Sequence, residues 1–118
     1  MFTILSFYKL KKINKLKNTK NLLIKKIKYL SVKGLIILSP EGINGTLAGT
    51  EKNINILKKI ILSNLKLIKF DIENITKSNF VPFLKAKIKI KSEVVPINEK
   101  YNFSNKTKKK ISVSITME

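Results

Sequence analysis

A glycine-rich segment at residues 40–49 constrains the fold of this chain more than any other feature. It holds three of the four glycines, at positions 42, 45 and 49. An apolar run at residues 34–39 leads into the segment, and a helical pattern begins after Thr50. Glycine, and after it asparagine, tolerates the positive φ of tight reversals. The segment therefore predicts a strand, a tight turn and a second strand that feeds a helix.

Four residues of this segment, Glu41, Gly42, Asn44 and Gly45, are interpreted as structural turn residues. Turn glycines usually serve the backbone conformation, and a functional loop is the alternative. Glu41 is expected at an exposed position, as a turn residue or as the partner of a lysine. If Gly42 or Gly45 has a positive φ, its replacement by valine is expected to lower the free energy of unfolding by about 1–3 kcal/mol.

Regular patterns on both sides of the segment give the order β-α-β-β-α-β with one more strand. Alternation or apolar runs predict strands at residues 3–9, 35–38, 45–49, 69–75 and 84–95, and helical spacing predicts helices at residues 14–30 and 51–64. Thr50 is the expected N-cap of the second helix. The order is typical of the α+β class, with a ferredoxin-like (acylphosphatase-like) split βαβ sandwich. We expect an antiparallel sheet with two helices on one face.

The same patterns predict which side chains form the core. The expected core residues are Leu5, Phe7, Leu23, Ile27, Ile54, Leu57, Ile61 and Ile88. At 118 residues the chain is expected to form one domain, over residues 1–97. Residues 98–118 are polar and carry four lysines at positions 106–110, a composition typical of a linker or mobile tail.

The charge balance points to a polyanionic partner. The net charge is +18, because 25 basic residues face only seven acidic ones. All of the basic residues are lysine, and the heavy use of lysine, isoleucine and asparagine indicates an AT-rich genome. The absence of arginine weakens any bidentate recognition of bases or phosphates. Genome bias also supplies acidic codons, so the shortage of carboxylates still favours a nucleic acid as partner.

One predicted strand carries an ordered row of lysines. Lys85, Lys87, Lys89 and Lys91 occupy every second position, so alternation sends them to one face about 6.5–7 Å apart. This spacing is close to that of phosphates along a nucleic-acid strand, which makes the four lysines RNA-binding candidates. The alternative is an ordinary solvated strand face. No carboxylate interrupts the row, and this slightly favours binding.

Several classes of site are excluded or unsupported by the composition. The chain has no cysteine, histidine or tryptophan, so disulfides, thiolate metal sites and Ser-His or Cys-His nucleophile pairs are ruled out. The carboxylates are too scattered for an acid/base pair or a magnesium site. We predict no catalytic residue, no metal site and no cofactor. A P-loop, the phosphate-loop arginine of acylphosphatases and the aromatic pattern of RNA-recognition motifs are also missing.

No segment has the length and apolarity of a membrane span, and residues 1–30 lack the pattern of a signal peptide. We therefore expect no membrane association and a cytoplasmic address.

Three blocks of the chain are similar to one known family. They are Ser6-Phe7-Tyr8-Lys9, the segment at residues 34–49 that contains Glu-Gly-Ile-Asn-Gly, and the lysine-rich segment at residues 82–95. In order and spacing they resemble the N-terminal domain of the rhodanese-related tRNA uridine hydroxylases. The resemblance covers residues 3–97, and the block around Glu41 is its most specific part.

The resemblance implies an acylphosphatase-like domain that precedes a rhodanese-like domain with an active-site cysteine. It also implies tRNA as a partner, since the complete enzymes hydroxylate the wobble uridine with oxygen. This chain has no cysteine, so no catalytic residue carries over and the chain alone is expected to be inactive. It is expected to be a fragment, a truncated product or one piece of a split enzyme. The other hypotheses are a stand-alone basic RNA-binding or ribosome-associated protein, and a purely structural domain.

Overall fold

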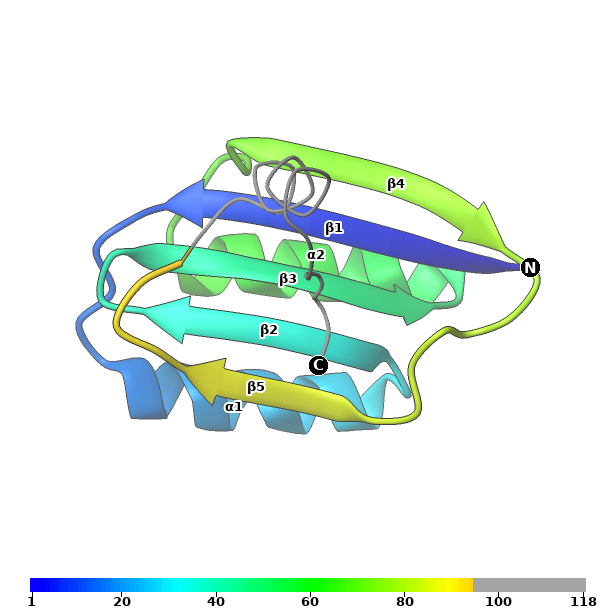
Figure 1. Cartoon of the computed structure of the whole chain (residues 1–118), viewed down its shortest axis with the longest axis horizontal. Helices are drawn as coiled ribbons and strands as arrows, with labels where there is room; N and C mark the ends of the chain where they lie inside the picture. Colours follow the sequence, from blue (N-terminus) through cyan, green and yellow to red (C-terminus); the bar gives the residue numbers. More distant parts are fainter. Residues whose placement is uncertain (95–118) are drawn as a thin grey trace, which may run out of the picture.

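A computed structural model describes residues 1–94 of the chain. Its elements are β1 (Phe2–Leu10), α1 (Leu16–Tyr29), β2 (Lys33–Ser39), β3 (Gly42–Gly49), α2 (Glu51–Asn64), β4 (Ile72–Ser78) and β5 (Ala86–Ile90). The strands form one five-stranded sheet, and both helices lie behind it on the same face in Figure 1. The predicted α+β, ferredoxin-like fold is confirmed.

The strand order in the sheet is β4-β1-β3-β2-β5. The β1–β3, β1–β4 and β2–β3 pairs are antiparallel, whereas β5 runs parallel to β2, with Ile88 opposite Ile36. The prediction of an antiparallel sheet is therefore wrong for the last strand, and the sheet is mixed. The segment between β4 and β5 crosses from one edge of the sheet to the other, as Figure 1 shows, so β5 enters in the direction of β2.

Strand alternation and the helical stripes meet in one hydrophobic core between the helices and the sheet. All eight core residues predicted from the sequence are at most 5% exposed. Phe70, from the loop before β4, inserts its ring beside Phe7, with the ring centroids 4.6 Å apart. The sequence places Phe70 inside a strand, but β4 begins only at Ile72, because an apolar side chain in a buried loop imitates the strand pattern.

The ends of the helices are fixed by local hydrogen bonds. The Thr50 hydroxyl accepts from the Asn53 N–H at 3.3 Å, which confirms the predicted N-cap. Each helix ends in a residue with positive φ, Ser31 after α1 and Lys66 after α2, where glycine is more usual. Gly34 lies at the start of β2.

The last two strands differ from the strands predicted from the sequence. β4 covers Ile72–Ser78, so it is shifted from the predicted residues 69–75. β5 covers five residues rather than the whole predicted segment at residues 84–95. The predicted linker or tail at residues 98–118 lies outside the described residues. Within residues 1–94, neither helix has the length and apolarity needed to cross a membrane.

Candidate nucleic-acid interface

The glycine-rich segment forms a hairpin whose two-residue loop is Pro40 and Glu41, with Ser39 paired to Gly42. The Ser39 hydroxyl accepts the Glu41 N–H at 3.1 Å, a bond that stabilises the turn. Neither Gly42 nor Gly45 has a positive φ, so the premise of the valine prediction is wrong. Close packing explains these glycines, because a Cβ on Gly42 would lie 2.3 Å from the Lys9 carbonyl oxygen.

Two polar residues of the hairpin have positions that the sequence did not predict. The Glu41 carboxylate accepts the Val94 N–H at 3.2 Å, so it ties the chain after β5 back to the turn. Its partner is thus a backbone amide rather than a lysine, and no sequence signal identifies such a contact. Asn44 lies within β3 and is buried, opposite Tyr8 of β1 and Ile37 of β2.

The lysine row lies along the edge strand β5. Lys87 and Lys89 are inside the strand, opposite Leu35 and Ile37 of β2. Lys85 and Lys91 flank it, and their backbone groups still bond to β2: the Gly34 N–H donates to the Lys85 carbonyl at 2.9 Å, and the Lys91 N–H donates to the Leu38 carbonyl at 2.8 Å. All four lysines are exposed, and within residues 1–94 none of them makes an ion pair.

Alternation determines the face that the row occupies. Ile88 is buried in the core against the helices, so its neighbours Lys87 and Lys89 point to the opposite face of the sheet. No helix of residues 1–94 covers this face, which we call the open face. The registers give the other residues of this face on the described strands: Lys33, Leu35, Ile37 and Ser39 of β2, Gly42, Asn44, Thr46 and Ala48 of β3, Phe2, Ile4, Ser6, Tyr8 and Leu10 of β1, and Ile72, Asn74, Thr76 and Ser78 of β4. None of these residues is acidic, so nothing on these strands opposes an anion at the row.

Carboxylates gather instead around β4 and α2. Three ion pairs join Lys9 to Asp71 at 2.9 Å, Lys58 to Glu73 at 2.6 Å and Lys77 to Glu51 at 3.0 Å. These pairs occupy the β4 side of the molecule and its helix-covered face. Within residues 1–94, lysines near the β4 edge of the sheet are thus paired with carboxylates, whereas those of the β5 edge are not.

The Asp71 carboxylate, just before β4, accepts two hydrogen bonds from the end of β1. The Leu10 N–H donates to its Oδ2 at 3.0 Å, and the Lys9 ammonium donates to its Oδ1. The backbone hydrogen bond first, and then the Lys9 contact, lower the pKa of this carboxyl from its ordinary value. Asp71 therefore acts as a structural anion that closes the start of β4 onto the end of β1.

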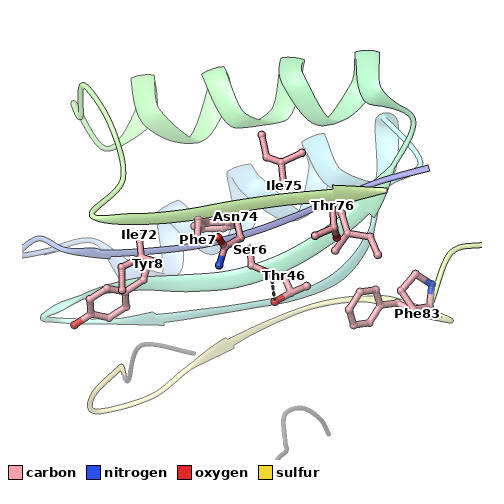
Figure 2. Close-up of a pocket in the computed structure, with 11 residues that line it drawn as sticks. Ser6, Phe7, Tyr8, Thr46, Ile72, Asn74, Ile75, Thr76 and Phe83 are labelled. Atoms are coloured by element: carbon pink, nitrogen blue, oxygen red, sulfur yellow. Dashed lines mark hydrogen bonds between the residues drawn. The ribbon is translucent and has the colours of Figure 1, made fainter. Parts of the chain in front are cut away.

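The open face also contains a shallow hollow of about 430 Å³ over β1, β3 and β4. Figure 2 shows Tyr8 at one end of this hollow and Phe83 at the other, with Ser6, Asn74 and Thr46 between them. The Ser6 and Thr46 hydroxyls are hydrogen bonded to each other at 3.3 Å. Within residues 1–94 no group of three or more acidic, cysteine or histidine residues is placed to hold a metal ion.

The hydroxyl- and amide-lined open sheet and the two helices behind it define a domain of the acylphosphatase-like class. A family model described as the UPF0176 acylphosphatase-like domain matches residues 2–94. The chain belongs to this family, as the resemblance in its sequence predicted.

Curated relatives carry the name of one enzyme. The tRNA uridine(34) hydroxylase of Pelagibacter ubique (strain HTCC1062) is 42% identical over 106 residues, which cover 90% of this chain and 35% of that protein. The tRNA uridine(34) hydroxylase of Legionella pneumophila (strain Paris) is 33% identical over 92 residues, which cover 78% of this chain and 36% of that protein. The chain thus spans about a third of the length of these relatives, matching their N-terminal domain.

Solved structures agree with the fold. The Klebsiella pneumoniae BlrP1 structure at pH 8.0 superimposes with a TM-score of 0.62 and 18% identity, covering 78% of this chain and 24% of that chain. The acylphosphatase from Bacillus subtilis superimposes with a TM-score of 0.54 and 8% identity, covering 77% of this chain and all of that chain. At such low identity these likenesses support the fold alone.

Proposed function

We propose that this chain is the RNA-contacting, non-catalytic domain of a tRNA uridine-34 hydroxylase. The observation that carries the proposal is the unpaired lysine row on β5, held to β2 by backbone hydrogen bonds at both ends. Lysines on an ordered strand bind phosphates without the cost of ordering the backbone of a flexible arm. The names of the relatives give the polyanion its chemical class, a tRNA.

Catalysis in such an enzyme would belong to a rhodanese-like domain with an active-site cysteine. This chain has no cysteine, so its own part is to position the RNA. The partners proposed are therefore tRNA and a rhodanese-like catalytic domain, in the same polypeptide or in a second one. The proposed address is the cytoplasm, and neither a cofactor nor a membrane enters the proposal.

Reconstitution tests this division of labour. The part of the Pelagibacter relative that lies outside the match would be purified alone and mixed with this chain. Mass spectrometry of nucleosides would then measure hydroxylation of uridine 34. We expect neither piece alone to modify tRNA and the mixture to do so, with the activity reduced when Lys85, Lys87, Lys89 and Lys91 are all changed to Gln. Full activity of the catalytic part without this chain, or turnover by this chain alone, would contradict the proposal.

A second function is supported by a separate observation. Leu35 and Ile37 of β2 are half-buried apolar side chains on the open face, and such residues also suit contact with another protein domain. In that case the chain is a structural support for the catalytic domain. The lysine variant would then leave the reconstituted activity unchanged, whereas changing Leu35 and Ile37 to Ser would remove it. A stand-alone RNA-binding protein would instead bind RNA and contribute nothing to the mixture.

A further inference from the structure

The hollow on the open face lies next to the lysine row, and the two features are connected through one loop. Pro82 and Phe83 line the hollow, and Lys85 follows Phe83 by only two residues. An RNA chain whose phosphates follow the lysine row toward Lys85 therefore reaches the end of the hollow at Phe83. In the sheet, β3 is two strands from β5, so the hollow begins about 10 Å from the row.

The chemistry of the hollow suits a planar group with polar edges. Phe83 is half-buried, so part of this aromatic residue remains accessible to a stacking partner. Asn74 and Thr76 are exposed, and within residues 1–94 their side chains make no hydrogen bond. An amide offers a donor and an acceptor side by side, the arrangement that matches the edge of a nucleobase.

The geometry points to a nucleobase site in this hollow: an unpaired base of single-stranded RNA stacks on Phe83 and hydrogen bonds to Asn74 while its phosphates contact the lysine row. Unpaired bases are commonly recognised by stacking on aromatic side chains and by hydrogen bonds to their edges. Charge complementarity commits the site to RNA rather than to a protein, because no acidic side chain of the described strands lies on this face. The inference rests on the proposed RNA contact and adds a preference for bases to it.

Two RNA probes and three variants test the site. The probes are a fluorescein-labelled twelve-residue oligouridylate and an abasic strand of the same length, and the readout is the Kd from fluorescence anisotropy at fixed salt. Phe83→Ala removes the stacking ring. Phe80→Ala is the control, since Phe80 is 65% exposed and lies outside the hollow. Circular dichroism during heating verifies that both variants fold.

We expect the wild-type chain to prefer the base-bearing strand by about tenfold or more, the usual size of one base stacked on an aromatic ring. Phe83→Ala is expected to lose this preference and to bind the abasic strand like wild type. Asn74→Leu is expected to weaken only the base-bearing strand, and Phe80→Ala to change neither Kd by more than about twofold.

Three results would overturn the base site and are distinguishable. A wild-type chain that binds both strands equally uses its phosphate contacts alone, which leaves the proposed RNA contact standing. A Phe83→Ala variant that binds both strands normally but fails to bind the catalytic part of a relative makes the hollow a protein contact. A wild-type chain that binds neither strand nor tRNA removes the proposed function itself.

Discussion

The two edges of the sheet are secured in different ways. β4 has no fully buried side chain, and its Glu73 and Lys77 form ion pairs with Lys58 and Glu51 of α2. β5 has Ile88 in the core, 5% exposed, and makes no ion pair within the described residues. The lysine of β4 is thus held in an ion pair, whereas the lysines of β5 make no ion pair with any described residue.

The lysines at the two edges differ in what they contribute to stability. Exposed ion pairs stabilise a fold by at most about 1 kcal/mol each, so the pairs at β4 matter little beyond placing the strand. A row of like charges repels itself and disfavours the compact state slightly unless an anion neutralises it. Lysines without an ion pair, as on β5, therefore indicate an anionic partner better than the three lysines that already pair with carboxylates.

Replacement of Gly34 is expected to give the largest loss of stability. Gly34 lies in β2, and its N–H donates to the Lys85 carbonyl just before β5. It has a φ of +137°, and a Cβ there would lie 2.1 Å from the Thr46 carbonyl oxygen. Gly34→Ala is therefore expected to lower the free energy of unfolding in urea by about 3 kcal/mol or more. Gly49→Ala is the control, because its φ is not positive and its Cβ would meet only a Val32 methyl at 3.2 Å, so a smaller loss of about 1 kcal/mol is expected. Equal losses would show that the β5 side has no special backbone requirement.

The apolar anchor of β5 is the next test of the comparison. Ile88→Ala removes the buried side chain of that edge and is expected to cost about 2–4 kcal/mol in urea unfolding. Ile75→Ala on β4 is the matched change at the other edge, where the side chain is 51% exposed. It is expected to cost less than about 1 kcal/mol. A larger loss for Ile75 than for Ile88 would reverse the account of the two edges.

Local sequence patterns predicted the core, the hairpin and the face of the lysine row. The alternation of β1 and the stripes of both helices identify the core, since period alone decides which side chains face inward. The glycine-rich turn identifies the hairpin, although its glycines serve close packing rather than positive φ. The lysine row was visible in the sequence because its spacing is that of a strand face.

The parts that escaped prediction depend on contacts distant in sequence. The parallel pairing of β5 with β2 follows from the path of the loop across the sheet, and the Glu41–Val94 hydrogen bond joins residues 53 positions apart. Phe83 and Asn74 line the same hollow although they come from the loop before β5 and from β4. No period or short motif encodes such meetings.

The smallest effect concerns Asp71 at the β4 edge. Its folded pKa is lowered from 3.8, so its contribution to stability is present above that value and is lost as the pH falls through the folded pKa. Asp71→Asn is expected to cost less than about 1 kcal/mol at neutral pH, given that the side chain is 42% exposed. The difference from wild type in urea unfolding is expected to shrink below about pH 4. A difference that stays constant with pH would assign the effect to packing rather than to charge.

The central claim is that an ordered lysine row on β5, rather than positive charge in general, binds RNA. Its most direct test is the salt dependence of single-stranded RNA binding for three four-lysine variants. The first changes Lys85, Lys87, Lys89 and Lys91 to Gln. The second changes Lys52, Lys59, Lys66 and Lys69, which are exposed on the α2 and β4 side. The third changes Lys106, Lys108, Lys109 and Lys110, which lie outside the described residues.

Each phosphate contacted contributes about −0.7 to the slope of log affinity against log salt on single strands. The β5 variant is therefore expected to flatten the slope by about 2–3 and to lose more affinity than either of the other two. The α2-side variant is expected to change the slope by less than about 0.7. The account would be contradicted if the variant at residues 106–110 lost more affinity and more salt dependence than the β5 variant. Equal losses for all three variants would contradict it as well, because they would indicate nonspecific attraction between charges.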